Sequence, residues 1–369
     1  MTRNFLIVGA TGQQGKATIN AILKTLANST QRQDIKILAL TRSISSPKSQ
    51  ALQSEYPEIT LIQGDIQAPQ PIFEQHPSTS SVFIVTVPPN DEAQAIPLIE
   101  AATASTQVDH IVFSSVDRGG DVVSWTQPTE VPHFAAKHRI ELRLRELCEA
   151  NKKRWTILRP TGFMDSYNPG FFGQMMASLW AEGMPKDRKM QLISTHDIGV
   201  FAAKALLNPD TWSGKATALA GDELSFLELQ KAFREVVGEE LPQTYKAVAY
   251  PILWMVKDAS KSFEWFRTEG WKADINTNKP VNMQFTAFAL ATLFIIPLSY
   301  AHPLAKTKEC GCPRKCPKED KVKCLKGDKR CKVAGTCSFF VICDNIAIPC
   351  GADTTLHICV PKDFDCTSI

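Results

Sequence analysis

The sequence predicts an α/β protein: a doubly wound parallel sheet with a small C-terminal subdomain, followed by a disulfide-rich tail dominated by loops. A glycine-rich stretch at residues 9–15 directly follows an apolar run at residues 5–8. Strand-like and helix-like segments then alternate as far as residue 237. Ten of the 11 cysteines lie between Cys310 and Cys366, which separates a cysteine-poor first part from a cysteine-dense end. A chain of 369 residues has room for this division into more than one domain.

The elements of the first part follow from short apolar runs bounded by turn residues. Strands are expected near residues 4–8, 35–40, 59–63, 82–87, 110–114 and 155–158. Helices are expected near residues 13–27, 93–105, 134–150, 196–207 and 225–237, with Thr195 capping the fourth. Strands that are apolar throughout are buried on both faces, and strand–helix alternation with right-handed crossovers gives a parallel sheet. Ligands of such sheets bind beyond the carboxyl ends of the strands.

The glycine-rich turn predicts a dinucleotide site. Gly9 permits the tight turn, Gly12 lets the backbone approach a pyrophosphate, and Gly15 lets the helix pack closely on the strand. Free N–H groups and the positive end of the helix dipole then face the negative charge of the ligand. The residues expected to line the phosphate site are Gly9, Thr11, Gly12, Gln13, Gln14 and Gly15.

The end of the second strand predicts which dinucleotide is bound. NAD-binding proteins usually carry an acidic residue there, which accepts a hydrogen bond from the ribose 2′-hydroxyl. This chain has Arg42 instead, which suits the 2′-phosphate of NADP, and Lys48 is a second, less certain contributor. The competing interpretation is that Arg42 is an ordinary solvated arginine.

Residues after the later strands are further candidates for the same edge of the sheet. Asp65 either accepts from the adenine amino group or forms a turn. The backbone around Thr86 either lines the cofactor or belongs to a strand that two prolines terminate. Ser115 is a candidate catalytic hydroxyl, and the segment containing Phe163 is expected to reach the nicotinamide end.

Four strings make the first part resemble the NmrA-like family of atypical short-chain dehydrogenase/reductases over about residues 1–275. They are GATGQQG at 9–15, SSVDRGG at 114–120, HFAAKHRIE at 133–141 and LRPTGFMDS at 158–166. The resemblance implies a Rossmann domain, a small α/β subdomain from about residue 160, and NADP(H) bound in the cleft between them. It places the NADP-binding domain at residues 1–280.

The resemblance also bears on catalysis. Active members of the dehydrogenase group use a Tyr-x-x-x-Lys pair, in which the lysine lowers the tyrosine pKa and holds the nicotinamide ribose. Lys137 stands at the lysine position, but His133 stands at the tyrosine position, and no tyrosine lies between Tyr56 and Tyr167. His133 is either a substitute proton donor or only the start of a helix. Lys137 either holds the ribose or is a solvated helix lysine.

Two functions follow for residues 1–280. One is an NADP(H)-binding redox sensor or regulator that acts through a partner protein. The other is an NADPH-dependent oxidoreductase that reduces a small-molecule quinone or carbonyl substrate. No basic stripe or aromatic ladder favours direct nucleic-acid binding, and no metal site is expected in this part. A single cysteine before residue 300 suits a cytoplasmic or nuclear location.

The end of the chain has a different chemistry. Residues 283–301 read as a secretory signal peptide, with an uncleaved membrane helix as the alternative. Residues 302–369 have too few large apolar residues for a core, so their ten cysteines are expected to form disulfides in a secreted, cysteine-rich domain; thiolate metal binding is the alternative. Because signal peptides act at the start of a nascent chain, we expect that two reading frames are joined here, the second starting at Met283.

Overall fold

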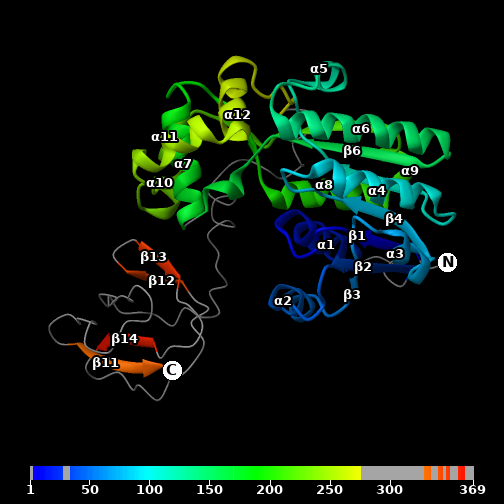
Figure 1. Cartoon of the computed structure of the whole chain (residues 1–369), viewed down its shortest axis with the longest axis horizontal. Helices are drawn as coiled ribbons and strands as arrows, with labels where there is room; N and C mark the ends of the chain where they lie inside the picture. Colours follow the sequence, from blue (N-terminus) through cyan, green and yellow to red (C-terminus); the bar gives the residue numbers. More distant parts are fainter. Residues whose placement is uncertain are drawn as a thin grey trace. The chain divides into compact units, whose positions relative to one another are not determined.

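A computed structural model of the chain describes residues 3–27, 34–168 and 170–275, together with four strands between residues 328 and 361. The chain divides into two compact units, Met1–Phe294 and Ile295–Ile369, which are described separately. The first unit contains the expected Rossmann-like α/β fold (Figure 1).

Seven parallel strands form the main sheet of the first unit, in the order β3-β2-β1-β4-β5-β6-β9. The order reverses beside β1, which is where ligands bind in sheets of this kind. The strands are β1 (Arg3–Ile7), β2 (Ile35–Thr41), β3 (Thr60–Gln63), β4 (Thr79–Ile84), β5 (His110–Ser114), β6 (Arg154–Pro160) and β9 (Lys215–Leu219).

Helices cover both faces of this sheet. On one face α1 (Gln13–Leu26) packs with α8 (Thr195–Leu207), and on the other α4 (Asp91–Ala104) packs with α6 (Pro132–Ala150). Phe5 and Ile7 join the core under α1 and α8, while Leu6 and Val8 join the core under α4 and α6. Side chains of a strand alternate between its faces, so the unbroken apolar run supplies both cores at once.

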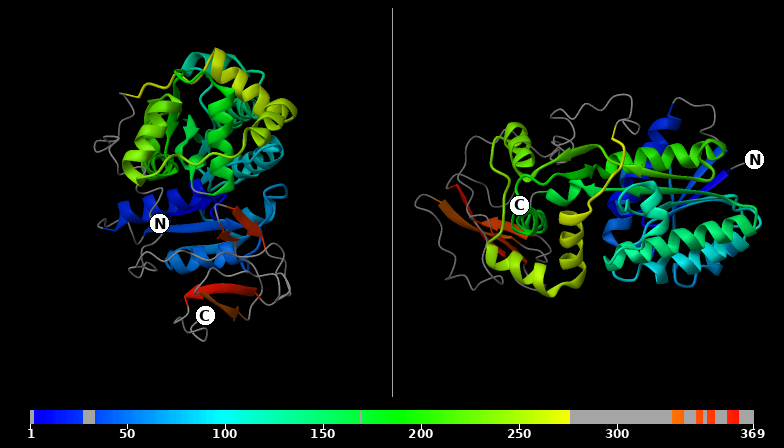
Figure 2. Two further views of the ribbon diagram at one scale, coloured as in Figure 1. Left: turned by 90° about the vertical axis from the view of Figure 1, so that its left-hand side faces the viewer. Right: turned by 90° about the horizontal axis from the view of Figure 1, so that it is seen from above.

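Shorter helices connect the strands, and a second group of elements forms the subdomain. The connecting helices are α2 (Pro47–Glu55), α3 (Gln70–Gln75), α5 (Asp121–Thr126) and α9 (Pro209–Trp212). The subdomain has a three-stranded sheet with helices gathered at one end of the main sheet (Figure 2). Its elements are β7 (Gly162–Phe163), η2 (Met164–Tyr167), α7 (Phe171–Gly183), β8 (Met190–Ile193), β10 (Asp222–Leu224), α10 (Phe226–Val237), α11 (Lys246–Met255) and α12 (Lys257–Thr268).

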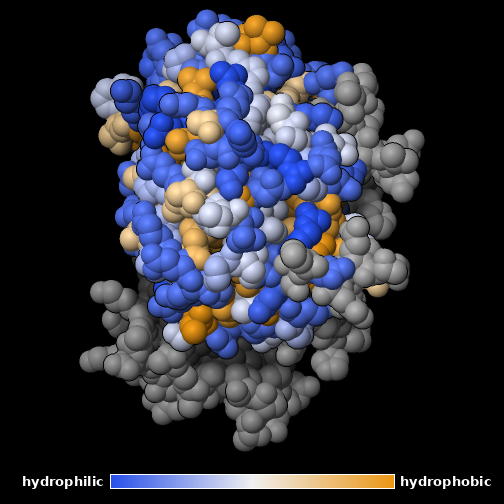
Figure 3. All heavy atoms as spheres, turned by 90° about the vertical axis from the view of Figure 1, so that its right-hand side faces the viewer, coloured by the Kyte–Doolittle hydropathy of each residue, from blue (hydrophilic) through white to orange (hydrophobic). Residues whose placement is uncertain are grey.

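The subdomain has an aromatic core of its own. Trp180 is fully buried and lies against the rings of Tyr167 and Phe226, at centroid distances of 5.4 and 5.8 Å. The outer surface is different: the face drawn in Figure 3 is mostly hydrophilic, with hydrophobic residues in small separate groups. Scattered surface groups of this kind are normal, so the apolar side chains that specify the fold are those inside it.

Two local expectations are wrong. The strand expected near 82–87 is β4 at Thr79–Ile84, whose pairing ends with Phe83 opposite Ile7 of β1 and Ile84 opposite Phe113 of β5. The cap of α8 is Ser194 rather than Thr195; the Ser194 hydroxyl accepts a hydrogen bond from the Asp197 N–H at 3.1 Å.

In the second unit the structure describes two antiparallel strand pairs. β11 (Asp328–Val333) pairs with β14 (Leu356–Pro361), and β12 (Phe340–Cys343) pairs with β13 (Ile346–Pro349). The expected signal peptide at 283–301 and the cysteine side chains of 302–369 lie outside what the structure describes. Among the described residues, no helix has the length and hydropathy needed to cross a membrane.

Candidate functional site

The turn between β1 and α1 is packed so tightly that a side chain at either of two glycines would force neighbouring atoms to move. Gly9 has a φ of +69°, and a Cβ atom there would lie 2.5 Å from Cγ2 of Val85. A Cβ at Gly15 would lie 2.3 Å from the carbonyl oxygen of Gly9. The helix therefore starts directly against the end of the strand, and its first N–H groups lie at the edge of the sheet where the strand order reverses.

The first turn of α1 offers these N–H groups to a ligand. Its cap, Gly12, is exposed and supplies no side-chain hydrogen bond, and no acidic residue lies in the first turn. Gln13 is exposed and Thr11 half-buried, whereas the Gln14 side chain turns to the sheet and accepts a 2.6 Å hydrogen bond from the hydroxyl of Ser114. Such a start can receive an anion, because its donors and its dipole are not neutralised by the protein.

Two cations follow β2 at the same edge of the sheet. Arg42 and Lys48 are both exposed, and neither has an ion-pair partner within the part of the chain that the structure describes. Asp65, after β3, is also exposed, and its carboxylate accepts a 2.9 Å hydrogen bond from the N–H of Gln67, as a turn-forming aspartate does. The free guanidinium of Arg42 is thus available for a phosphate, whereas one carboxylate oxygen of Asp65 is already engaged.

Lys137 is buried against the carboxyl ends of β4 and β5. Its Nζ donates to the Thr86 hydroxyl at 2.7 Å and to the Ser114 carbonyl at 2.9 Å, and lies 3.6 Å from the Asp91 carboxylate. Thr86 in turn donates to Asp91, which is itself buried. The ammonium also lies 4.9 Å from the ring centroid of Phe113. The lysine is therefore no solvated surface residue: it closes a network at the edge of the sheet that the sequence predicts as the cofactor site.

Burial sets the protonation of this lysine. Loss of hydration lowers the pKa of Lys137 to about 8, even though the nearby Asp91 carboxylate acts to raise it. The ammonium is thus charged at neutral pH and can lose its proton a little above it. A group tuned in this way can hold a hydroxyl by hydrogen bonding or exchange a proton with one.

The two other positions expected near the nicotinamide are partly enclosed. Ser115 is buried, and its hydroxyl accepts a long hydrogen bond of 3.4 Å from Arg118. Phe163 is half-buried in β7, at the start of the subdomain, and packs against the core under α1 and α8. The structure therefore places Ser115 just after the main sheet and Phe163 at the junction with the subdomain.

His133 lies in the first turn of α6 and faces the subdomain. Its Nδ1 is 2.8 Å from the carboxylate of Asp258, in the first turn of α12, which also accepts from the His133 backbone N–H at 3.3 Å. Burial acts to raise the pKa of Asp258, but the hydrogen bonds from His133 outweigh it and hold this pKa below its ordinary value. Sequence reasoning missed Asp258, because 125 residues separate it from His133.

Sequence reasoning also missed a buried ion network. Glu141 receives two hydrogen bonds from Arg118, at 3.1 and 2.7 Å, and two from Arg159, at 3.2 and 2.8 Å. None of the three side chains is exposed. Burial alone would raise the pKa of Glu141, but the two guanidinium groups hold it below its ordinary value. One signal was present: the three residues come one each from the strings at 114–120, 133–141 and 158–166.

No cluster of three or more histidine, cysteine or acidic side chains that could hold a metal ion occurs among the described residues. Cys148 is buried in α6, where loss of hydration raises its thiol pKa to about 12. It therefore has the character of an inert core residue rather than that of a nucleophile.

Comparison with known families identifies the chain. The model of the NmrA-like family matches residues 1–306, which is most of the sequence and extends beyond the 1–275 expected from its motifs. The chain belongs to the NmrA-like family. No curated protein sequence matches it significantly.

Solved structures show the same fold in other NmrA-like and related proteins. The triphenylmethane reductase of Citrobacter sp., complexed with NADP(H), is 16% identical, with a TM-score of 0.57; the match covers 79% of this chain and 100% of that one. The NADPH-dependent quinone oxidoreductase of Escherichia coli, complexed with NADPH, is 20% identical (TM-score 0.54; 75% and 93% covered). NmrA, a negative transcriptional regulator, is 18% identical (TM-score 0.50; 75% and 94% covered).

Proposed function

We propose that residues 1–280 bind NADP(H) and act as a cofactor sensor or regulator through a partner protein. The observation that carries the cofactor assignment is the first turn of α1, which has no side-chain cap, together with the exposed Arg42 after the neighbouring β2, which has no ion-pair partner among the described residues. The helix start would hold the pyrophosphate and Arg42 the 2′-phosphate. Two structurally similar proteins were solved with NADP(H) or NADPH, which supports the same ligand here.

Calorimetry on the full chain with NADPH and NADH tests this assignment. We expect tighter binding of NADPH, and Arg42→Ala should remove the preference by weakening NADPH binding alone, because only NADPH carries the 2′-phosphate. Lys36→Ala is the matched control: it removes an exposed cation from the other end of β2. Equal affinity of the unmodified chain for both nucleotides would contradict the assignment to NADP(H).

The sensor function is favoured by the incomplete Tyr-x-x-x-Lys pair, in which the lysine is kept and the tyrosine is replaced. Lys137 is retained, where it would lie near the nicotinamide ribose, but its hydrogen bonds already run to Thr86 and Ser114. His133 replaces the tyrosine and holds α12 of the subdomain through Asp258. A bound nucleotide would meet both the main sheet and the subdomain, so its occupancy would change the surface offered to a partner. NmrA itself, which has this fold, is a transcriptional regulator.

A second function, NADPH-dependent reduction of a quinone or carbonyl, is favoured by one observation. The contact of His133 Nδ1 with Asp258 leaves the imidazole Nε2 for a substrate, and the His133 side chain is 24% exposed. A carboxylate that orients an imidazole is the arrangement used in acid–base catalysis. Bound NADPH would supply the hydride, and His133 the proton.

Turnover measurements separate the two functions. The full chain is incubated with NADPH and a panel of quinones and aldehydes, and nucleotide oxidation is followed by absorbance. Oxidation that His133→Phe abolishes, without loss of NADPH binding, identifies a reductase. Tight binding with no oxidation identifies a sensor. His196→Phe is the control, because His196 is an exposed histidine on α8.

For residues 283–369 we propose a separate secreted product, as the composition of this segment indicates. Residues 283–301 would be a signal peptide and residues 302–369 a secreted disulfide-bonded domain, made as a separate chain from a second reading frame. Residues 1–280 would then stay in the cytoplasm or nucleus. Transcript reads across codons 275–290 test the join, and continuous message with a single protein band of full mass would contradict it.

A further inference from the structure

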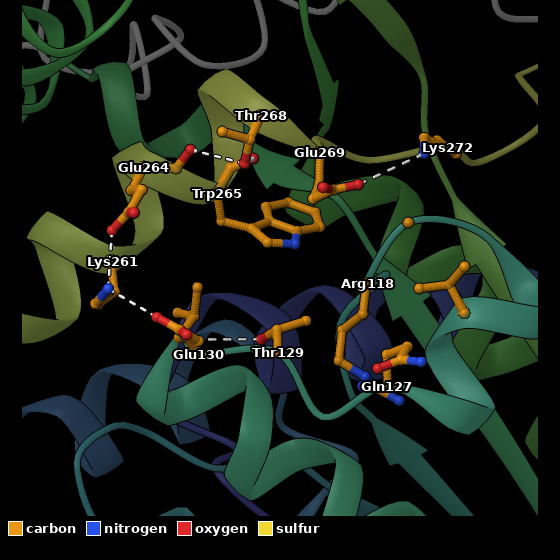
Figure 4. A pocket seen from close by; sticks show the side chains of 13 residues that line it. Arg118, Gln127, Thr129, Glu130, Lys261, Glu264, Trp265, Thr268, Glu269 and Lys272 are labelled. Carbon is orange, nitrogen blue, oxygen red and sulfur yellow. Dashed lines mark hydrogen bonds and ion pairs between the residues drawn. The ribbon is translucent and has the colours of Figure 1, made fainter.

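A cavity of about 480 Å³ lies between the loop that leads into α6 and the helix α12 (Figure 4). Its walls come from residues 118–131 of the main domain and residues 261–272 of the subdomain. Pockets for small molecules range from about 300 to 1,000 Å³, so this one is large enough for a ligand. None of the residues assigned to the NADP(H) site lines it. We call it the α12 pocket.

One wall of the α12 pocket is formed by the ring of Trp265, a residue that is 7% exposed. The indole of Trp265 lies in the middle of the view in Figure 4, and the pocket lining also includes Val123, which is 37% exposed, and the buried Val131. The ring is held edge-on by Phe134 and Trp271, at centroid distances of 5.1 and 5.9 Å. A fixed aromatic face of this kind favours a flat ring stacked on it.

The rim carries more negative than positive charge. Lys261 is shared between Glu130 at 2.7 Å and Glu264 at 2.9 Å, and Lys272 lies 4.0 Å from Glu269. Three carboxylates thus face two ammonium groups at the pocket. Arg118 also lines the pocket; its charge and that of Arg159 are balanced by Glu141, which both arginines bind, and by Asp121, which binds Arg159. The excess of carboxylates disfavours an anionic ligand.

The floor offers one hydrogen-bond donor. Arg118 is fully buried, and its Nε has no hydrogen-bond partner among the described residues. An unpaired buried donor is costly, and a ligand oxygen or ring nitrogen that approached it would satisfy it. The other nitrogens of the Arg118 guanidinium donate to Glu141, to the Ser115 hydroxyl and to backbone carbonyls, so Nε is the donor that is left.

From these features we propose that the α12 pocket binds a flat aromatic molecule that has no negative charge and bears a carbonyl oxygen or a ring nitrogen. The ring stacks on Trp265 and the acceptor points to Arg118. The site is separate from the nucleotide site, and its ligand binds whether or not NADP(H) is present.

Coumarin is a suitable probe because it is flat, neutral and soluble and bears one carbonyl; coumarin-3-carboxylate is its anionic counterpart. Both are titrated into the full chain by calorimetry, with and without saturating NADPH. Two variants alter the pocket: Trp265→Leu removes the stacking face, and Thr268→Arg fills the entrance from an exposed position. Their matched controls are Trp254→Leu and Thr211→Arg, which change exposed residues outside the pocket.

We expect one coumarin per chain, with binding weakened about tenfold or more by each pocket variant and unchanged by each control. Coumarin-3-carboxylate should bind about tenfold more weakly than coumarin. Saturating NADPH should not displace coumarin. Thr268→Arg keeps the test valid if Trp265→Leu disturbs the aromatic core. No coumarin binding, equal binding by all four variants, or displacement by NADPH would overturn the proposal.

Discussion

Glu141 and Arg118 form a two-armed ion pair, with oxygen–nitrogen distances of 3.1 and 2.7 Å, in which neither side chain is exposed. Arg159 binds the other side of the same carboxylate. The pair therefore joins the loop after β5, the middle of α6 and the end of β6. Because these segments carry the candidate site on one side and the α12 pocket on the other, Glu141 fixes the position of both.

Replacing Glu141 tests how much the fold depends on this network. Glu141→Gln leaves the buried guanidinium of Arg118 without a counter-charge and that of Arg159 with Asp121 alone, so we expect a loss of about 3–5 kcal/mol in the free energy of unfolding. Urea denaturation of the variant measures it. Glu149→Gln, an exposed change on the same helix, should cost almost nothing. Equal stability of the two variants would show that the buried network is dispensable.

Gly15→Ala tests the contact between α1 and β1. The new methyl group would lie 2.3 Å from the Gly9 carbonyl oxygen, so the helix must move away from the strand. We expect a loss of about 1–3 kcal/mol in stability, together with weaker NADPH binding, because the N–H groups move with the helix. Denaturation and calorimetry measure the two effects. Lys24→Ala, in the last turn of α1, is the control, and an unchanged affinity in Gly15→Ala would argue against a phosphate at this turn.

The lowered pKa of Lys137 predicts how stability depends on pH. Between about pH 8 and the ordinary value of 10.5, the unfolded lysine binds a proton that the folded one has lost. The free energy of unfolding should therefore rise as the pH increases across this window, by about 3 kcal/mol for the full shift in the lysine pKa. Below about pH 8 the buried lysine is charged, and there its burial destabilises the folded protein most. The rise should be absent in Lys137→Met and present in Lys204→Met, an exposed control. Parallel urea titrations from about pH 7 to about pH 11 compare them.

Asp258→Asn tests a dependence of the same sign, in an acidic pH window. The pKa of Asp258 is lowered in the folded protein, so the carboxylate contributes stability above its ordinary pKa of 3.8 and loses it as the pH falls through the lower folded value. The pair with His133 is partly exposed, so its contribution at neutral pH should be about 1 kcal/mol or less. Denaturation of both proteins at neutral pH and in acid measures the difference, which should vanish in acid. A difference that persisted in acid would mean that the carboxylate acts in another way.

The sequence alone predicted six of the seven strands of the main sheet and the glycine-rich turn after β1, but it missed β9 and the three strands of the subdomain sheet. The run at residues 5–8 predicts a strand buried on both sides, and the glycines after it predict the tight start of α1, because both depend on neighbours within a few residues. The shift of β4 was not predictable, since the partner strand β1 decides where its pairing ends. The cap of α8 was misplaced by one residue, because Ser194 and Thr195 are equally good caps by type and only the backbone path selects between them.

What the sequence determined by itself is the strand–helix alternation of the first part, the close-packed turn at Gly9 and Gly15, and the presence of an arginine directly after β2. Only the tertiary structure decided what the charged residues of the motifs do. It pairs His133 with Asp258, closes Thr86, Asp91 and Lys137 into one network, and buries Arg118, Glu141 and Arg159 together. The reason is that a backbone pattern is local, whereas a buried charge is stable only beside a partner that the fold brings from a distant part of the chain.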